Sequence, residues 1–242
     1  MSRRGVTLLE LLVAITLLSL LTAGVLLAMR VGFNAMYLTN EKLFDARRVL
    51  GVQRILEQQI AGLIPVIADC APALGMPPSR VPFFQGAPES MRFVSSYSLG
   101  EGARGYPRIL EYQVIPREGQ EGVRLVVNEH FYTGSRSAGL FCAGLAPDPA
   151  SGVWLPRFHP IQVGPGSFVL ADGLAYCRFF YRETLPPPVL ERWMPVWPRA
   201  HWPTAVRIEM APLEMQPSRP PLVSITAPIR VNRAPFESYA EY

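Results

Sequence analysis

The feature that most constrains this chain is a stretch without proline that runs from residue 6 to residue 64. Its first part, residues 6–29, is apolar and carries a single charged side chain, that of Glu10. Because about 20 apolar residues suffice for a helix to cross a bilayer, this part predicts one transmembrane helix over residues 6–30. Arg3 and Arg4 precede it, and basic residues on that side place the N-terminus in the cytoplasm.

The proline-free stretch continues as a predicted amphipathic helix over residues 31–64, and Pro65 ends it. At 1.5 Å per residue, a helix of this total length would measure roughly 85–90 Å. Apolar residues recur in its second half at spacings of three or four, which places them on one face. They are Val49, Val52, Leu56, Ile60 and Leu63. We expect this face to cover a β-sheet.

Beyond Pro65 the hydrophobic period changes from helical to alternating, which predicts a β-rich domain over residues 65–242. The expected strands are 91–94, 109–115, 123–129, 175–182, 204–210 and 222–226, with 229–231 as an optional continuation of the last. Turn-forming residues at 116–122 predict a hairpin, and 71–88 is expected to be a loop. A long helix followed by antiparallel strands predicts an α+β fold, with the helix packed on antiparallel sheets.

Glu10 is a functional-site hypothesis in its own right, because an ionised carboxylate inside hydrocarbon is costly and needs a positive partner. Gly5 adds a second signal. A secretory signal peptide carries its small-residue cleavage site after the apolar core, whereas Gly5 precedes it. Cleavage after Gly5 would remove a basic pentapeptide, residues 1–5, and leave the helix attached to the protein.

The run Gly5-Val6-Thr7-Leu8-Leu9-Glu10 resembles the N-terminal signature of the type IV prepilin family, which includes the pseudopilins of type II secretion. It departs from that signature only in Val6, where phenylalanine is usual. The resemblance implies that a prepilin peptidase cleaves between Gly5 and Val6 and methylates the new amino group. It also implies that Glu10 faces the N-terminal amine of a neighbouring subunit. Opposite charges ~4 Å apart attract by about 4 kcal/mol at intermediate dielectric. The alternative is a plain signal anchor with an accidental glutamate.

The remainder of the chain resembles the J-type minor pseudopilins in several local patterns. They are Phe93-Val94-Ser95, Ile109-Leu110-Glu111-Tyr112, the stretch from Asp172 to Arg182, a tryptophan-bearing linker, and residues 202–208. The resemblance implies a helix joined to two antiparallel sheets in a single-pass protein of the bacterial inner membrane, with a periplasmic domain.

The same resemblance implies a set of partners and no cofactor. The partners are the I-type and K-type minor pseudopilins, the major pseudopilin, the prepilin peptidase and the inner-membrane assembly platform. Together they would build the tip of a pseudopilus that exports folded proteins. Two alternatives stay open: a minor pilin of a type IV pilus acting in adhesion, motility or DNA uptake, and a membrane-anchored periplasmic enzyme or receptor.

The three cysteines are Cys70, Cys142 and Cys177. An extracytoplasmic domain lies where disulfides persist. Cys70 and Cys142 lie in loop-like sequence rich in glycine, alanine and proline, so a bond between them is the preferred pairing, although spacing alone leaves the others open. Cys177 falls in a strand pattern and is expected to pack as a small buried side chain.

Few residues suggest chemistry. His130 could form an acid–base group with Glu111 and Glu129, and His159 or His201 could act as a base. No nucleophile elbow, metal-ligand run or phosphate loop accompanies them, so we expect no enzyme, no metal and no cofactor. The net charge of +4 falls by two with the leader arginines, and no basic block tracks phosphates, so nucleic acid is not an expected partner.

Trp193, Trp197 and Trp202 lie in one proline-rich link. Tryptophan is enriched at binding hot spots, which suggests a contact surface for a partner pseudopilin or for secreted cargo. The alternative is that these tryptophans cover a sheet edge, where proline blocks strand addition.

Overall fold

The computed structural model describes residues 8–71, 77–148, 152–213 and 223–230. The chain divides into two compact units, Met1–Val49 and Leu50–Tyr242. Gly5 and Val6 lie outside the described residues.

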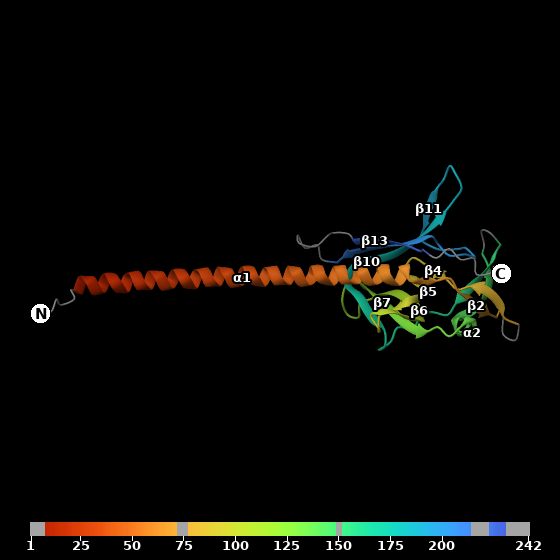
Figure 1. Cartoon of the computed structure of the whole chain (residues 1–242), viewed down its shortest axis with the longest axis horizontal. Coiled ribbons are helices and arrows are strands. Elements are labelled where there is room, and N and C mark those ends of the chain that lie inside the picture. Colours follow the sequence, from red (N-terminus) through yellow and green to blue (C-terminus); the bar gives the residue numbers. More distant parts are fainter. Residues whose placement is uncertain (1–7, 72–76, 149–151, 214–222, 231–242) are drawn as a thin grey trace, which may run out of the picture. The chain divides into compact units, whose positions relative to one another are not determined.

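A single helix, α1 (Leu8–Ala61), forms the described part of the first unit and enters the second (Figure 1). Its segment Leu8–Phe33 is long and apolar enough to span a membrane, and none of it is buried within the protein. The helix ends three residues before the predicted Ile64. Gly62 packs so closely on the sheet that a Cβ atom there would lie 2.8 Å from Ser95 Oγ. The two residues that follow, Leu63 and Ile64, form strand β1.

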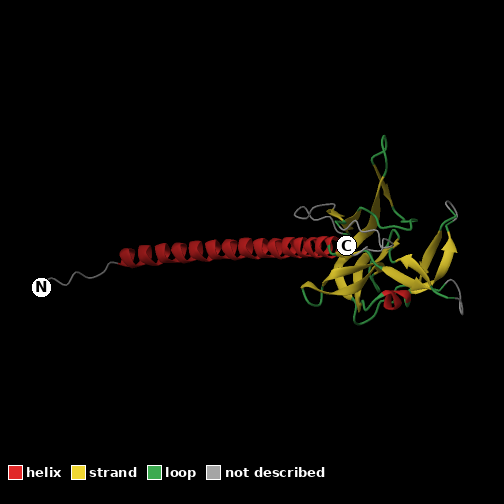
Figure 2. Cartoon of the chain, turned by 45° about the vertical axis from the view of Figure 1, so that its right-hand side comes forward, coloured by secondary structure: helices red, strands yellow, loops and turns green. Residues whose placement is uncertain are grey.

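Strands dominate the second unit (Figure 2). Within the described residues, nine strands form one antiparallel sheet with the main order β1-β5-β6-β7-β10-β12-β13. Their bounds are β1 (Leu63–Ile64), β4 (Gln85–Gly86), β5 (Ser90–Ser98), β6 (Ala103–Pro116), β7 (Val123–Phe131), β10 (Phe168–Thr184), β11 (Glu191–Met194), β12 (Ala205–Pro212) and β13 (Val223–Pro228). Strand β4 pairs with β5, and β11 pairs with β10. The predicted hairpin is the β6–β7 pair.

The expectation of two main sheets, which the family resemblance implied, is not met. Strand β10 is 17 residues long and belongs to both halves of one sheet. Its first half pairs with β7, as in Phe168↔Val127, and its second half pairs with β12, as in Phe179↔Ile208. The pairing shifts register around Gly173, whose φ of +67° suits a residue without a Cβ atom.

Two short hairpins and a short helix were not foreseen. Strand β2 (Ile67–Cys70) pairs with β3 (Ser79–Pro82), strand β8 (Cys142–Pro147) pairs with β9 (Trp154–Phe158), and helix α2 spans Ser135–Gly139. The expected loop over residues 71–88 is therefore wrong where β3 and β4 form. Strands of two to four residues are too short to show an alternating pattern in the sequence. Residues 72–76 of this segment lie outside the described part. In the described part of the chain the last strand is β13, and Ile229 and Arg230 do not continue it as expected. Leu222 and Val231 lie outside the described residues.

The sheet is buried on both of its faces at β5 and β6. On one face, Leu56, Ile60 and Leu63 pack with Phe93 and Leu110, which confirms the predicted apolar face of the helix. On the other face, the neighbouring residues Val94 and Ile109 join a second core that we call the satellite core. Its further members are Val66, Ala68, Cys70, Phe83 and Ala138. Each buried large apolar side chain contributes roughly 1.5–3 kcal/mol, so both cores hold these strands in place.

Candidate functional site

Glu10 lies in the first turn of α1, and its side chain is exposed on the protein surface. Apolar side chains surround it, with 82% of Leu8, 75% of Leu9 and 57% of Leu11 exposed. A helix that is apolar on all sides is suited to lipid or to a bundle of like helices rather than to water. Glu10 is the single carboxylate that this segment offers to a neighbour.

The hydroxyl groups in the same segment bond to their own helix. Ser19 Oγ donates to the carbonyl of Ile15 at 2.8 Å, and Thr16 and Thr22 make similar bonds to carbonyls one turn earlier. These hydroxyls therefore need no outside partner, which suits an apolar solvent. Glu10 differs from them in carrying a carboxylate, which is costly to keep ionised in hydrocarbon.

A disulfide joins Cys70 to Cys142, the pair that the sequence analysis preferred. Both cysteines lie at strand ends, Cys70 closing β2 and Cys142 opening β8, and not in loops as expected. The bond closes a separation of 72 residues and holds the satellite core against the back of the sheet. Cys177 is buried in the main core, as expected, and burial raises the pKa of its thiol to about 12.

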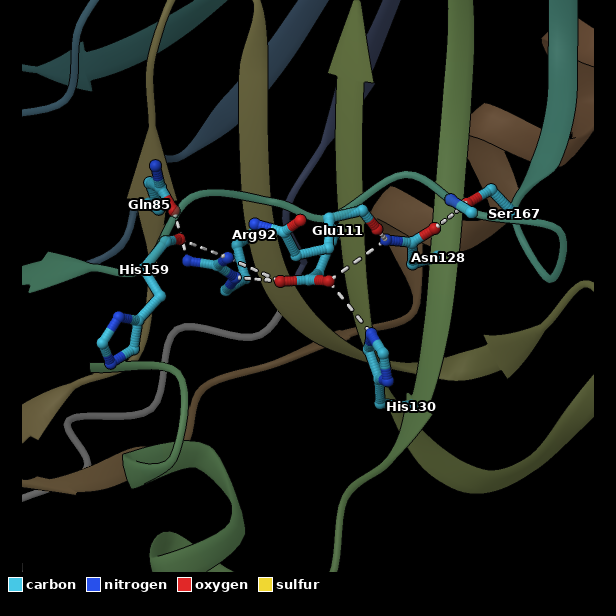
Figure 3. A network of polar contacts seen from close by, with 9 residues as sticks. Gln85, Arg92, Glu111, Asn128, His130, His159 and Ser167 are labelled. Carbon is cyan, nitrogen blue, oxygen red and sulfur yellow. Dashed lines mark hydrogen bonds and ion pairs between the residues drawn. The ribbon is translucent and has the colours of Figure 1, made fainter. Parts of the chain in front are cut away.

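A buried ion pair occupies the space between the sheet and the satellite core (Figure 3). Arg92 on β5 faces Glu111 on β6, with 1% and 5% of the two side chains exposed. Its Nε lies 2.7 Å from Glu111 Oε1, and its other nitrogens donate to Gln85 Oε1 and to the carbonyl of His159. The guanidinium also lies within 5.4 Å of two ring centroids, those of Phe141 and Phe158.

The second oxygen of Glu111 receives the remaining polar contacts. His130 Nε2 lies 2.9 Å away and Asn128 Nδ2 lies 3.3 Å away. Burial alone would raise the pKa of Glu111, but its bonds to His130 and Arg92 outweigh that effect and lower it. Asn128 continues the network, because it donates to the carbonyl of Gln162 and accepts from Ser167 Oγ.

This network is suited to holding segments of the fold together. It joins β5, β6 and β7 to the residues between β9 and β10, and the donors and acceptors satisfy one another. The expected acid–base group is divided: Glu111 meets His130, whereas Glu129 contacts the other side of the sheet, at Ser98 and Gln59. The ring of His159 points away from the ion pair in Figure 3, and only its carbonyl takes part. In the described part of the chain, no group of three metal-binding side chains occurs.

The three tryptophans have different surroundings. Trp197 is 6% exposed, donates through Nε1 to the carbonyl of His201 at 2.6 Å, and packs on Gly86. Its ring is part of the main core, so its burial favours a packing role over the expected partner contact. Trp202 is half-buried against the same core. Trp193 on β11 is also half-buried, but it lies outside the core.

Trp193 belongs to a surface of stacked side chains on β10, β11 and β12, which we call the arginine–aromatic face. Arg207 lies 4.6 Å from the Trp193 ring centroid and 5.2 Å from that of Phe180. The other members are Tyr176, Arg178 and Arg182. Beside this face, the loop between β10 and β11 projects from the sheet in Figures 1 and 2 and carries the exposed Val189 and Leu190.

The arginine–aromatic face carries fewer carboxylates than arginines. Glu191 pairs with Arg182 and Glu209 pairs with Arg207, at 3.0 and 3.1 Å. Arg178 lies directly opposite Glu209 in the strand register, yet it forms no ion pair with any carboxylate in the described residues. Sequence reasoning singled out Trp193 but not these arginines, because their stacking depends on cross-strand register.

Comparison with known proteins bears on the N-terminal segment. A family model described as the prokaryotic N-terminal methylation motif matches residues 1–26. No curated protein matches the chain. The match covers Gly5, Val6 and Glu10 together with the first part of α1. The N-terminal segment is therefore of the type IV prepilin kind, and it supports a pilin-like protein of a pilus or pseudopilus that is anchored in a membrane by one helix.

Proposed function

We propose that this chain is a J-type minor pseudopilin of a type II secretion system. The observation that carries the proposal is the combination of the methylation motif with the continuous helix α1, whose last turns are part of the core of a β-rich unit. A simple anchor needs no packed connection of this kind. The local sequence patterns in β5, β6, β10 and β12 favour the J type over other pilin-like proteins.

In this role the protein is cleaved after Gly5 in the inner membrane and methylated at Val6. Its apolar helix then packs beside those of other pilin-like subunits by van der Waals contact. Glu10 aligns with the free amino group of a neighbour, which brings opposite charges together once the subunits are in register. The periplasmic unit joins I-type and K-type partners at the tip of the pseudopilus.

The protein acts as a structural subunit and not as an enzyme. Support comes from the polar network around Glu111, in which each acceptor is engaged in holding β-strands together. The arginine–aromatic face supplies a surface for partner contact, because stacked arginines and tryptophan are typical of interface hot spots. Arg178 presents its guanidinium to a partner that carries a carboxylate.

Two measurements on the membrane-extracted protein test this proposal. Intact mass should correspond to a chain that begins at methylated Val6. Affinity purification from the native host should recover other chains with methylated N-termini, together with secretion-system components. Recovery with components of a type IV pilus would instead make the chain a minor pilin, and an uncleaved, unmethylated N-terminus would leave a membrane-anchored protein of another class.

A further inference from the structure

One polar side chain interrupts the apolar face of α1. Gln59 lies between Leu56 and Ile60 on that face, and none of its surface is exposed. A buried amide in an apolar interface costs free energy unless its donors and acceptor are bonded. Its position therefore calls for a specific set of partners on the sheet.

Gln59 makes contacts with three consecutive strands. Ser95 Oγ on β5 donates to its backbone carbonyl at 2.8 Å. The hydroxyl of Tyr112 on β6 donates to its side-chain oxygen, Oε1. Its amide nitrogen, Nε2, donates to Glu129 Oε1 on β7 at 3.2 Å. One helical residue is thus tied to β5, β6 and β7 at once.

The partners leave the amide a single orientation. Burial, with a further contribution from the charge of Glu129, raises the pKa of Tyr112 well above its usual value, so the phenol stays a donor. The carboxylate of Glu129 can only accept, so Nε2 must face it, and the amide oxygen then faces the phenol. Glu129 is itself held by Ser98 Oγ and by the backbone N–H groups of Leu99 and Gly100, at 2.9, 2.5 and 3.3 Å.

Apolar contacts alone would not select one placement of the helix. Hydrophobic attraction is non-directional, so the apolar contacts of the helix residues Leu56 and Ile60 would by themselves allow a slip of one turn, about 5 Å along the helix axis. We propose that Gln59 fixes the axial and rotational position of α1 on the β5–β6–β7 surface, through its contacts with Ser95, Tyr112 and Glu129. Buried polar residues set register in coiled coils in the same manner.

The consequence for assembly rests on the proposed function. Within the unit Leu50–Tyr242, the residue that sets the position of the helix on the sheet also determines which face of residues 50–61 meets the strands. A pilin-like subunit in which this helical segment took two positions on the sheet would present two different surfaces of its β-rich unit to neighbours.

The test measures helix position directly in the full-length protein in detergent. Spin labels are attached in a Cys177→Ala background through Arg54→Cys on α1 and Thr226→Cys on β13, both exposed positions. The test variant, Gln59→Leu with Tyr112→Phe, removes the amide together with its hydroxyl partner, so that no phenol is left unpaired. The matched control is Gln53→Leu, since Gln53 bonds to Glu57 within the helix and not to the sheet.

We expect one narrow distance distribution in the parent and in the Gln53→Leu control. In the double variant we expect a second population displaced by about 5 Å, one helical turn, while the protein stays folded. A single unchanged distance in the folded double variant would overturn the proposal. If that variant does not fold, Gln59→Met, which keeps side-chain length, is judged by the same criterion. None of these outcomes depends on whether the chain assembles with other pilin-like subunits.

Discussion

Arg92 and Glu111 form an ion pair that is almost wholly withdrawn from water, with their nearest charged atoms 2.5 Å apart. Buried pairs of this kind add little net stability, but removal of one partner strands the other charge. The pair lies between the main sheet and the satellite core, so its loss should weaken the packing of the satellite core on the sheet.

We predict that Glu111→Gln destabilises the protein by about 3–5 kcal/mol at neutral pH, because Arg92 keeps its buried charge without a counter-charge. Denaturant unfolding followed by circular dichroism measures this difference. Glu118→Gln, at an exposed position of the β6–β7 turn, is the matched control and should change the free energy of unfolding by less than about 0.5 kcal/mol. Equal effects of both changes would contradict a special role for the pair.

The pH dependence of stability has a definite sign. The pKa of Glu111 is lowered in the folded protein, and so is that of Glu183, which Arg199 holds with bonds of 2.7 and 3.3 Å. Groups of this kind stabilise the fold above the unfolded carboxyl pKa, which is about 4.3. That stabilisation is lost as pH falls through the lower, folded values. We therefore expect stability to decline below about pH 4, and less steeply in Glu111→Gln. A parallel decline in the two proteins would count against this assignment.

The disulfide between Cys70 and Cys142 should contribute substantially to stability. Because it closes a loop of 72 residues, its removal in a Cys70→Ser, Cys142→Ser variant should cost about 4 kcal/mol by the loop-entropy relation. A reductant should lower the stability of the parent by a similar amount and leave the variant unchanged. Cys177→Ala is the control, since that thiol lies in the other core and should leave the reductant effect intact.

Substitution of Trp197 should mainly lower stability, whereas substitution of Trp193 should mainly weaken partner binding. Trp197→Ala empties a core position and should destabilise the protein by about 3–5 kcal/mol. Trp193→Ala removes a ring stacked on Arg207 and should cost only about 1 kcal/mol, while it weakens co-purification with partner subunits. Arg178→Glu, on the same face, should also weaken co-purification without unfolding the domain. Normal partner recovery with both changes would show that this face is not a contact surface.

Substitutions in the N-terminal motif should affect processing and assembly separately. Gly5→Ala should leave the basic leader attached, as seen by intact mass, whereas Gly24→Ala should be processed normally because a Cβ atom there meets no neighbour. Glu10→Gln should be processed and folded but should fail to assemble, since a neutral amide offers no negative charge to a neighbour's amino group. Thr16→Val is the control for Glu10, because the Thr16 hydroxyl bonds only to its own helix. Normal assembly of Glu10→Gln would remove the charge-pairing role.

The sequence alone determined the parts of this protein that depend on local pattern. The apolar run over residues 6–29, the absence of proline to Ile64 and the stripe of Leu56, Ile60 and Leu63 predict α1 and its buried face, because helical periodicity is a property of neighbouring residues. It was also possible to predict the strands β5, β6, β7, β10 and β12 and the hairpin turn, because alternation and turn-forming residues are local patterns too.

Tertiary structure decided what depends on residues far apart in the chain. That β10 joins both halves of one sheet follows from pairings with β7 and β12 that no local pattern encodes. Which face of a strand meets the core also decides that Trp197 is buried and Trp193 is not. The same choice of face places Glu111 and Glu129 on opposite sides of the sheet. Gln59 appears in the sequence as a polar break in an apolar stripe, and only the meeting of helix and sheet supplies the donors and acceptors that make its burial favourable.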